Sequence, residues 1–458
     1  MGRVELKNKP IDITNRHSAS GFTISTLGCK VNQYESDAIA QSLKDTGCIL
    51  LPGEENADLC IINTCTVTQK AAMQSRQAIR QAIRNHPGAR IIVTGCYAQV
   101  DPSEIKKIKG VHDIIGHADK HEIPAMIVST EHVERPHPVL TCREISDERD
   151  YRQMAVVAFG KRTRPFLKIQ DGCNTFCSYC IVPYARGRSR SMILNSVLEN
   201  VHKIRQGGFC EVVLTGVHLG AYGLDLTPKT NLFNLLKRIQ ASTTIERVRL
   251  SSIEPLELTR DIIQLVADSN RFCRHFHIPL QSGDDGILKN MNRPYTRSFF
   301  RDLVLKINTL IPDAAIGVDT LVGFPGETET AFENTYSLIQ ELPVSYLHVF
   351  PFSSRAGTPA SRYPHKVPSK IIKTRCAKMR KLGNVKKRDF YKKFIGQQLE
   401  VLIESKRDSS TGYLKGLTSN YMPVLADGGN ELENTLVKVR IDKIFSNHAV
   451  IGNICYLG

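Results

Sequence analysis

Three cysteines at the spacing Cys-x-x-x-Cys-x-x-Cys have the clearest chemical use in this sequence. They are Cys173, Cys177 and Cys180, and no fourth cysteine lies near enough in the sequence to complete the set. A cubic iron–sulfur cluster takes a thiolate on each iron, so three clustered cysteines leave one iron open to bind another molecule. Zinc binding and core packing are the alternatives, but no second cysteine or histidine pair with zinc-ligand spacing follows downstream. The spacing therefore favours a cluster with one reactive iron.

A second set of three cysteines lies in the N-terminal third, where each cysteine ends a short apolar segment. The cysteines and their segments are Cys29 (residues 22–29), Cys65 (58–65) and Cys96 (90–96). Segments of helical composition at 35–44 and 69–84 separate them, which predicts a βαβαβ arrangement. The carboxyl ends of parallel strands gather at one edge, so we expect the three thiols to converge on a second open cluster. The alternative is that the three cysteines are buried in the core. We predict such a core position for Cys60, which lies inside its strand.

The middle of the chain predicts a partial (β/α)6 barrel, and the whole chain an α/β fold. Strand-like segments lie at residues 166–170, 211–215, 247–251, 276–280, 315–321 and 346–351, with helical segments at 193–206, 232–240, 258–268, 299–310 and 329–342. Ligands of such barrels bind where loops leave the carboxyl ends of the strands. The loop with Cys173, Cys177 and Cys180 follows the first of these strands.

The other strand ends carry residues that could contact a cofactor. These are Thr215, Gly216, Ser252, Glu254, Gln281, Ser282, Gly323 and Glu327. Glycines allow close backbone approach, while carboxylates and amides can bond an ammonium group, ribose hydroxyls or an adenine edge. The alternatives are a turn into the next helix at 323–327 and a helix start at Glu254. No Walker loop, G-x-G-x-x-G or H-E-x-x-H motif is present, and His275 and His277 are predicted to be structural.

Composition indicates a large enzyme with a polyanionic partner. The chain has 458 residues, a formal net charge of +16 and thirteen cysteines. It contains no apolar run of membrane-spanning length and no signal-peptide pattern, so we expect a cytosolic protein without membrane contact and with reduced thiols. Much of the excess charge lies in residues 369–393, which contain eleven Lys or Arg residues and a single acidic residue, Asp389. Interleaved apolar residues predict a basic amphipathic helix joining two domains, with a solvated linker helix as the alternative.

The last sixty or so residues predict a small β-barrel. Short alternating strands are expected at 399–404, 413–417, 422–425, 436–444 and 449–454. Barrels of this class often present aromatic and basic side chains to RNA, and Tyr413, Lys415 and Tyr421 are the predicted RNA-binding face.

From about Gly21 onward, the order of these parts resembles the methylthiotransferases of the radical S-adenosylmethionine (SAM) class. The segment at 26–36, Thr-Leu-Gly-Cys-Lys-Val-Asn-Gln-Tyr-Glu-Ser, resembles the branch that acts on N6-threonylcarbamoyladenosine in tRNA. Asp284 stands where many members of the family have serine. The resemblance implies these parts: a variable N-terminal extension (1–20), an N-terminal methylthiotransferase domain (21–140), a radical SAM partial barrel (155–365), a basic linker helix (366–394) and a TRAM RNA-binding domain (395–458).

The resemblance also implies the cofactors and the reaction. Two [4Fe-4S] clusters and SAM are expected, one cluster on Cys173, Cys177 and Cys180 to cleave SAM, and the other on Cys29, Cys65 and Cys96 to carry or donate sulfur. The reaction would convert N6-threonylcarbamoyladenosine at position 37 of tRNA to its 2-methylthio derivative, with an electron donor such as a flavodoxin or ferredoxin and a sulfur donor left open. The alternatives are isopentenyladenosine in tRNA, a ribosomal protein aspartate, or a non-catalytic iron–sulfur or RNA-binding protein.

Overall fold

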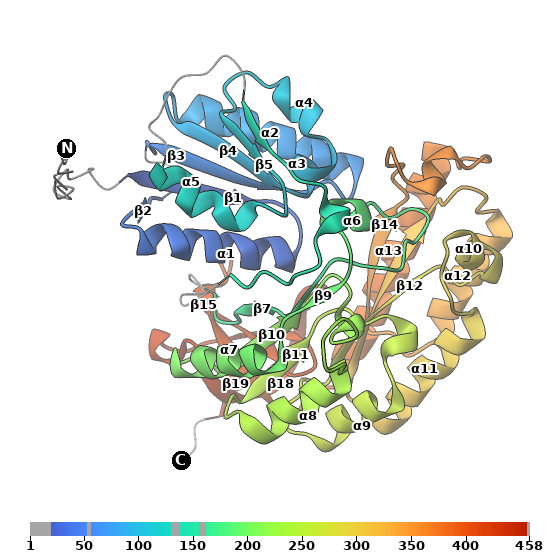
Figure 1. Cartoon of the computed structure of the whole chain (residues 1–458). Helices are drawn as coiled ribbons and strands as arrows, with labels where there is room; N and C mark the ends of the chain where they lie inside the picture. Colours follow the sequence, from blue (N-terminus) through green and yellow to red (C-terminus); the bar gives the residue numbers. More distant parts are fainter. Residues whose placement is uncertain (1–19, 53–55, 130–137, 155–161, 456–458) are drawn as a thin grey trace, which may run out of the picture.

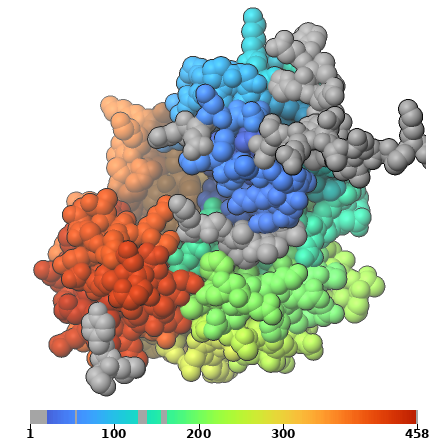
Figure 2. All heavy atoms as spheres, turned by 90° about the vertical axis from the view of Figure 1, so that its left-hand side faces the viewer, coloured from blue at the N-terminus to red at the C-terminus, as the bar shows by residue number. Residues whose placement is uncertain are grey.

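Three packed regions follow one another along the chain. The computed structural model describes residues 20–52, 56–129, 138–154 and 162–455. The N-terminal region lies above a middle region of strands and helices (Figure 1). Figure 2 shows the C-terminal region, in red, beside the green part of the middle region and below the blue N-terminal region. Among the helices in these residue ranges, none has both the length and the apolar character that a membrane crossing requires.

The N-terminal region is a six-stranded parallel sheet in the order β2-β1-β3-β4-β5-β6. Its strands are β1 (Gly21–Thr26), β2 (Ile49–Leu50), β3 (Leu59–Thr64), β4 (Arg90–Gly95), β5 (Asp113–Ile115) and β6 (Val139–Thr141). Its helices are α1 (Lys30–Asp45), α2 (Gln69–Asn85), α3 (Cys96–Val100), α4 (Pro102–Lys106) and α5 (Ile123–Ser129). The three predicted strands are β1, β3 and β4, and Cys60 lies in the core as expected.

The ends of these strands place the cysteines at helix starts. Cys29 directly precedes α1, and Cys96 is the first residue of α3. Gly95 has a φ of +98°, and a Cβ there would lie 2.6 Å from Oδ1 of Asn63. Only glycine fits this turn, because an L side chain would meet both backbone strain and a clash. The turn at Gly95 thus delivers Cys96 to the carboxyl edge of the sheet.

The middle region forms the predicted partial barrel. Two parallel three-stranded sheets, β11-β10-β7 and β12-β13-β14, are joined by bridges from Val248 to Phe272 and from Ser252 to His277. The strands are β7 (Phe166–Lys168), β10 (Glu211–Thr215), β11 (Arg247–Leu250), β12 (His275–Gln281), β13 (Ala315–Val322) and β14 (Tyr346–Pro351), beside the short pair β8 (Gln170–Asp171) and β9 (Arg190–Ser191). The edge strands β7 and β14 leave one side of the barrel open.

Helices cover the outer face of these strands. They are α7 (Leu194–Gln206), α8 (Leu232–Ser242), α9 (Arg260–Asp268), α10 (Asp285–Asn290), α11 (Arg297–Leu310), α12 (Glu329–Glu341) and α13 (Ser369–Lys392). The short helix α6 (Val182–Arg186) instead packs against α3 of the N-terminal region. Outward residues such as Leu214, Ile278 and Val318 belong to one hydrophobic core with the helices. Because side chains alternate along a strand, the neighbours of these residues, including His277 and Asp319, face the barrel interior.

The basic helix α13 is more than a linker, because it packs against β14 and β13. Met379 is fully buried in the core of the middle region. Arg375 and Lys378 form ion pairs with acids of the middle region, at Glu327 and Glu333. Part of the charge that suggested a polyanionic partner is therefore neutralised within the protein.

The C-terminal region is a closed β-barrel in the order β15-β16-β17-β19-β18. The strands are β15 (Gln398–Arg407), β16 (Leu414–Thr418), β17 (Pro423–Ala426), β18 (Leu436–Ser446) and β19 (Ala449–Ile454). The prediction that Tyr421 belongs to an RNA-binding face is wrong. Its ring stacks on His275 of the partial barrel at 4.3 Å and lies 5.4 Å from the Arg249 guanidinium. The C-terminal barrel therefore closes the base of the partial barrel.

Candidate active site

The first cysteine site is the loop between β8 and α6. The Cys180 amide donates to the Cys177 carbonyl, and the Cys173 amide donates to the Gly187 carbonyl, both at 3.0 Å. Burial raises the pKa of the Cys180 thiol to about 12, and the charges of Cys177 and Cys173 add to this rise. The three thiols thus belong to one short loop, as the sequence predicts for ligands of one cluster.

Two basic side chains that the sequence did not single out contact these thiols. His218 places Nδ1 3.5 Å from the Cys173 sulfur and Nε2 2.6 Å from the Glu257 carboxylate. Burial alone would lower the pKa of His218, but Cys173 and Glu257 raise it to about 10. Arg293 donates to the Cys177 sulfur at 3.4 Å. Two positively charged side chains therefore lie beside the thiols, each also paired with a carboxylate.

Five of the predicted cofactor contacts lie at strand ends around this loop. Arg293 also donates to Glu254, at 3.1 Å, so this carboxylate is tied to Cys177 through one guanidinium. The Ser252 hydroxyl lies 2.6 Å from Nδ1 of His277. The remaining three are Thr215, which is buried, Gly216, where a Cβ would lie 2.8 Å from Gln170, and Gln281, which has a φ of +65°. A positive φ on a non-glycine residue at a strand end is typical of functional sites.

Ser282, Gly323 and Glu327 have supporting roles instead. The Ser282 hydroxyl lies 3.3 Å from that of Thr335. The Glu327 carboxylate accepts from the Gly323 amide at 3.1 Å and from Arg375 at 2.7 Å. The polar groups of these residues already have hydrogen-bond partners within the protein. Contact between them and a cofactor stays a prediction, and the geometry does not favour it.

Alanine at Gly323 should therefore destabilise the fold rather than weaken SAM binding. Gly323 has a φ of +84°, and a Cβ there would lie 2.6 Å from Cδ1 of Ile372. Gly326 is a matched control, because its φ is +85° and a Cβ there meets no atom within 4 Å. We expect denaturant unfolding to show a loss of about 1 kcal/mol for Gly326→Ala and about 1–3 kcal/mol more for Gly323→Ala. Lost SAM binding at unchanged stability would instead make Gly323 a cofactor contact.

The second cysteine site is the carboxyl edge of the N-terminal sheet. A Cβ on Gly28 would lie 2.9 Å from the Cys65 sulfur, so the loop leading to Cys29 packs directly on that thiol. The Cys96 sulfur lies 3.4 Å from Nε2 of His117. Burial, opposed by the charge of Arg186 and assisted by Cys65 and Cys29, raises the pKa of Cys96 to about 12. The structure thus brings the three predicted cysteines together despite their separation in sequence.

Arg186 joins the two cysteine sites. It ends α6, six residues after Cys180, and α6 packs against α3, which begins at Cys96. Its guanidinium donates to Glu35 at 3.0 and 3.2 Å, to Asn32 at 2.5 Å and to Asp171 at 2.8 Å. Asn32 and Glu35 belong to α1, which starts next to Cys29. One buried side chain therefore fixes the loop of the first site against the helix of the second.

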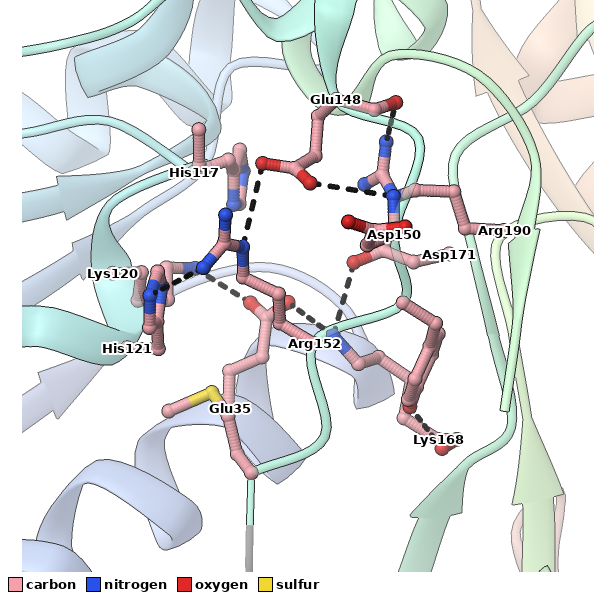
Figure 3. Close-up of a pocket in the computed structure, with 13 residues that line it drawn as sticks. Glu35, His117, Lys120, His121, Glu148, Asp150, Arg152, Lys168, Asp171 and Arg190 are labelled. Atoms are coloured by element: carbon pink, nitrogen blue, oxygen red, sulfur yellow. Dashed lines mark hydrogen bonds and ion pairs between the residues drawn. The ribbon is translucent and has the colours of Figure 1, made fainter. Parts of the chain in front are cut away.

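Two lysines extend this contact into a buried network (Figure 3). Lys168 lies between Glu35 and Asp171, at 3.1 and 3.0 Å, and Lys120 pairs with Glu35 at 2.6 Å. Burial would raise the pKa of Glu35, but Arg186, Lys120 and Lys168 together hold it well below its usual value. A cavity of about 40 Å³ lies against the network. The carboxylates are therefore ionised across the neutral pH range.

The N-terminal region also covers the open side of the partial barrel. Helix α1 packs against the edge strand β7. At the other edge, beyond β14, the Gln69 amide donates to the Ser353 hydroxyl at 2.9 Å, and Arg355 donates to Thr66. Both cysteine sites thus lie at one interface between the sheet and the partial barrel.

The interior of the partial barrel carries a chain of polar groups. From Ser252 it continues through His277, whose Nε2 lies 2.7 Å from Asp319, to His348, whose Nδ1 lies 3.1 Å from the same oxygen. His348 is exposed, while His277 and Asp319 are half-buried. The prediction that His275 is a satisfied structural histidine holds for Nε2, which lies 2.7 Å from the Tyr346 hydroxyl, but its buried Nδ1 has no hydrogen-bond partner among the described residues.

The donor sets fit two iron–sulfur clusters. Each site offers three thiols, the ligand type that such clusters take, and all thirteen cysteines of the chain are free. His218, Arg293 and Arg186 supply positive charge beside the thiols, which suits an anionic cluster. No local sequence motif marks four of the residues at these sites, His117, His218, Arg293 and Arg186. The only signal in the sequence that points to them is that each follows a predicted strand or a cysteine.

Comparison with known proteins agrees with this architecture. Residues 21–116 match the family described as Uncharacterized protein family UPF0004, and residues 167–339 match the Radical SAM superfamily. The threonylcarbamoyladenosine tRNA methylthiotransferase MtaB of Bacillus subtilis is 40% identical over 421 residues, which cover 91% of this chain and 93% of that protein. The tRNA-2-methylthio-N(6)-dimethylallyladenosine synthase of Clostridium botulinum is 34% identical over 442 residues, 95% of this chain and 97% of that protein.

A solved structure shares the fold. The radical S-adenosylmethionine methyltransferase TsrM from Kitasatospora setae, with cobalamin and a [4Fe-4S] cluster bound, superposes with a TM-score of 0.52 at 16% identity. The match covers 75% of this chain and 77% of that one.

Proposed function

The chain belongs to the radical SAM methylthiotransferase family, and from this premise we propose that it converts N6-threonylcarbamoyladenosine at position 37 of tRNA to 2-methylthio-N6-threonylcarbamoyladenosine. The observation that carries the proposal is the pair of three-cysteine sites held together by Arg186 at one interface. The choice of substrate is supported by the likeness to the Bacillus subtilis protein, at 40% identity against 34% for the dimethylallyladenosine synthase.

The cofactors are two [4Fe-4S] clusters and SAM. Cys173, Cys177 and Cys180 would hold the cluster that binds SAM, and Cys29, Cys65 and Cys96 would hold the other. When bound, these groups supply a 5′-deoxyadenosyl radical and a source of sulfur for C2 of the adenine. Thr215, Gly216, Ser252, Glu254 and Gln281 lie at the strand ends where SAM would be bound.

The protein's own part is to position the groups and exclude water. Arg293 and His218 hydrogen-bond the sulfurs of Cys177 and Cys173 and so fix the first site. His277 and Asp319 face the barrel interior, where they can donate to and accept from the target base. The N-terminal region closes the open side, which brings the reacting groups together and keeps stray hydrogen donors away from the radical.

The partners follow from this reaction. tRNA is the substrate, an electron donor such as a flavodoxin or ferredoxin would reduce the first cluster, and a sulfur donor would replenish the second. We place the reaction in the cytoplasm, where tRNA is modified.

Mass spectrometry of tRNA nucleosides tests the substrate directly. Cells lacking the gene and any paralogue should lose 2-methylthio-N6-threonylcarbamoyladenosine and accumulate its unmodified precursor. Return of the native gene should restore the product, while a copy with all six cluster cysteines changed to alanine should not. Unchanged levels in the deletion strain would refute the substrate, and loss of the dimethylallyladenosine derivative would assign the chain to the other branch.

Binding of tRNA should depend on salt and on the exposed face of α13. Exposed cations on this helix without an ion pair in the described part of the chain include Lys370, Lys373, Lys381 and Arg388, and Lys393 directly follows the helix. Changing the first four to glutamine should flatten the plot of log affinity against log salt by about 0.7–0.9 for each phosphate that the protein no longer neutralises. Lys378→Gln is the control, because this ammonium is paired with Glu333. Salt-independent binding would rule out the binding of tRNA phosphates by α13.

A further inference from the structure

The buried ion-pair network at the interface has unequal charges. Its members are Glu35, Lys120, Lys168, Asp171 and Arg186, with N···O distances from 2.6 to 3.2 Å and every side chain at most 10% exposed. Among these five side chains three cations face two carboxylates, so the set carries excess positive charge, and buried Arg190 adds a further cation beside Asp171. An uncompensated charge at such depth is costly, and a compensating anion nearby would offset that cost.

The N-terminal cysteine site is placed to supply that anion. Arg186 donates to Asn32, three residues after Cys29, and its helix packs on the helix that begins at Cys96. Burial raises the pKa of Cys65, whereas the positive charge of Arg186 acts in the opposite direction. Lys120 also donates to Asn63, two residues before Cys65, at 3.4 Å. The excess charge therefore lies against all three segments that carry the thiols.

We propose that this network is the fixed counter-charge of the iron–sulfur cluster at Cys29, Cys65 and Cys96 and that it sets the reduction potential of that cluster. A [4Fe-4S]²⁺ core with three thiolates carries one net negative charge, which is opposite in sign to the excess charge of the network. One-electron reduction adds a second negative charge to the cluster, and a buried cation stabilises the reduced form more than the oxidised one. The inference rests on the proposed function, because it takes a cluster at these cysteines as given.

A charge series separates this role from simple packing. Glu35→Gln leaves three cations and one carboxylate, Arg186→Gln leaves two of each, and the double variant restores a single excess positive charge. The potential of the second cluster should become more positive with Glu35→Gln and more negative with Arg186→Gln, and it should return toward the wild-type value in the double variant. If charge sets the potential, the two single variants must shift it in opposite directions. If the variants only loosen the packing, there is no reason for the two shifts to differ in sign.

The measurement is an EPR-monitored redox titration of the full-length chain with Cys173, Cys177 and Cys180 changed to alanine, so that the second cluster gives the signal. Arg152→Gln is the matched control, because Arg152 lines the same cavity (Figure 3) but its side chain is 41% exposed and paired with Glu148. Its potential should equal that of the parent chain. Shifts in the same direction for Glu35→Gln and Arg186→Gln, or no shift in either, would overturn the proposal.

A charge-conserving variant, Arg186→Lys, is needed if the Arg186→Gln protein does not assemble the second cluster. Arg186→Lys should then restore iron content and a potential near the wild-type value, since it retains the cation with fewer hydrogen bonds. Failure of Arg186→Lys to restore the cluster in a folded chain would show that shape matters and charge does not, which contradicts the proposal. A parent chain without any second cluster would instead refute the proposed function itself.

Discussion

Alanine in place of Cys173, Cys177 and Cys180 together should abolish SAM cleavage. The yield of 5′-deoxyadenosine from reduced, reconstituted protein should fall at least about 1,000-fold, because the group that delivers the electron is removed and the protein has no substitute for it. Iron should fall from about eight to about four atoms per chain, since the second cluster keeps its ligands. Liquid chromatography of the nucleosides and an iron assay check both values.

Cys60→Ala is the control for this triple variant. Cys60 is 2% exposed and lies in the core of the N-terminal region, so its loss removes a thiol without touching either site. It should keep both clusters and the wild-type yield. Substantial 5′-deoxyadenosine from the triple variant would refute the assignment of these ligands, whereas no 5′-deoxyadenosine from the wild-type chain would favour a scaffold protein over an enzyme.

Alanine in place of Cys29, Cys65 and Cys96 together should have the complementary effect. SAM cleavage should persist, because His218, Arg293 and the first cysteine loop are unchanged, while the methylthiolated nucleoside should fall below detection. The ratio of 5′-deoxyadenosine to methylthiolated product should rise at least about 100-fold, the scale on which misplaced reactants lose rate. Nucleoside mass spectrometry of a single-turnover reaction measures both products.

Cys48→Ala is the matched control in the same region, since Cys48 is a half-buried free thiol outside the site. It should leave the product ratio unchanged. A triple variant that still forms the methylthiolated nucleoside would show that these three cysteines do not supply the sulfur, even if they bind iron.

The sequence predicts the strands and helices that hold the cysteine sites better than it predicts the other side chains that contact those sites. Expected strands at 211–215 and 346–351 coincide with β10 and β14, because long apolar segments between helical patterns carry a strong signal. It does not predict β2, β5 and β6, which are two or three residues long and too short to show a period. Their place in the sheet is set by pairing, of β2 with β1, of β5 with β4 and of β6 with β5.

The candidate site shows the same limit. The six cysteines could be found because their spacing, or their place at strand ends, has a chemical reason. Arg186 could not, because it stands near Arg188 and Arg190 in a basic chain, and its partner Glu35 is 151 residues away. The prediction for Tyr421 fails for a related reason: an aromatic residue in a β-barrel can face RNA or a neighbouring domain, and only tertiary contacts distinguish the two.

The contact between the two barrels determines where relatives could be recombined. Arg249 donates to the carbonyls of Ser419 and Thr418, at 2.9 and 3.0 Å, while Tyr421 covers His275. A chimera joined at residue 395 would leave this guanidinium with only its bonds to Glu211 unless the incoming half reproduced both carbonyls. The C-terminal barrel therefore cannot be exchanged between relatives on its own. Hybrids between two branches of the family should exchange the partial barrel and the C-terminal barrel together.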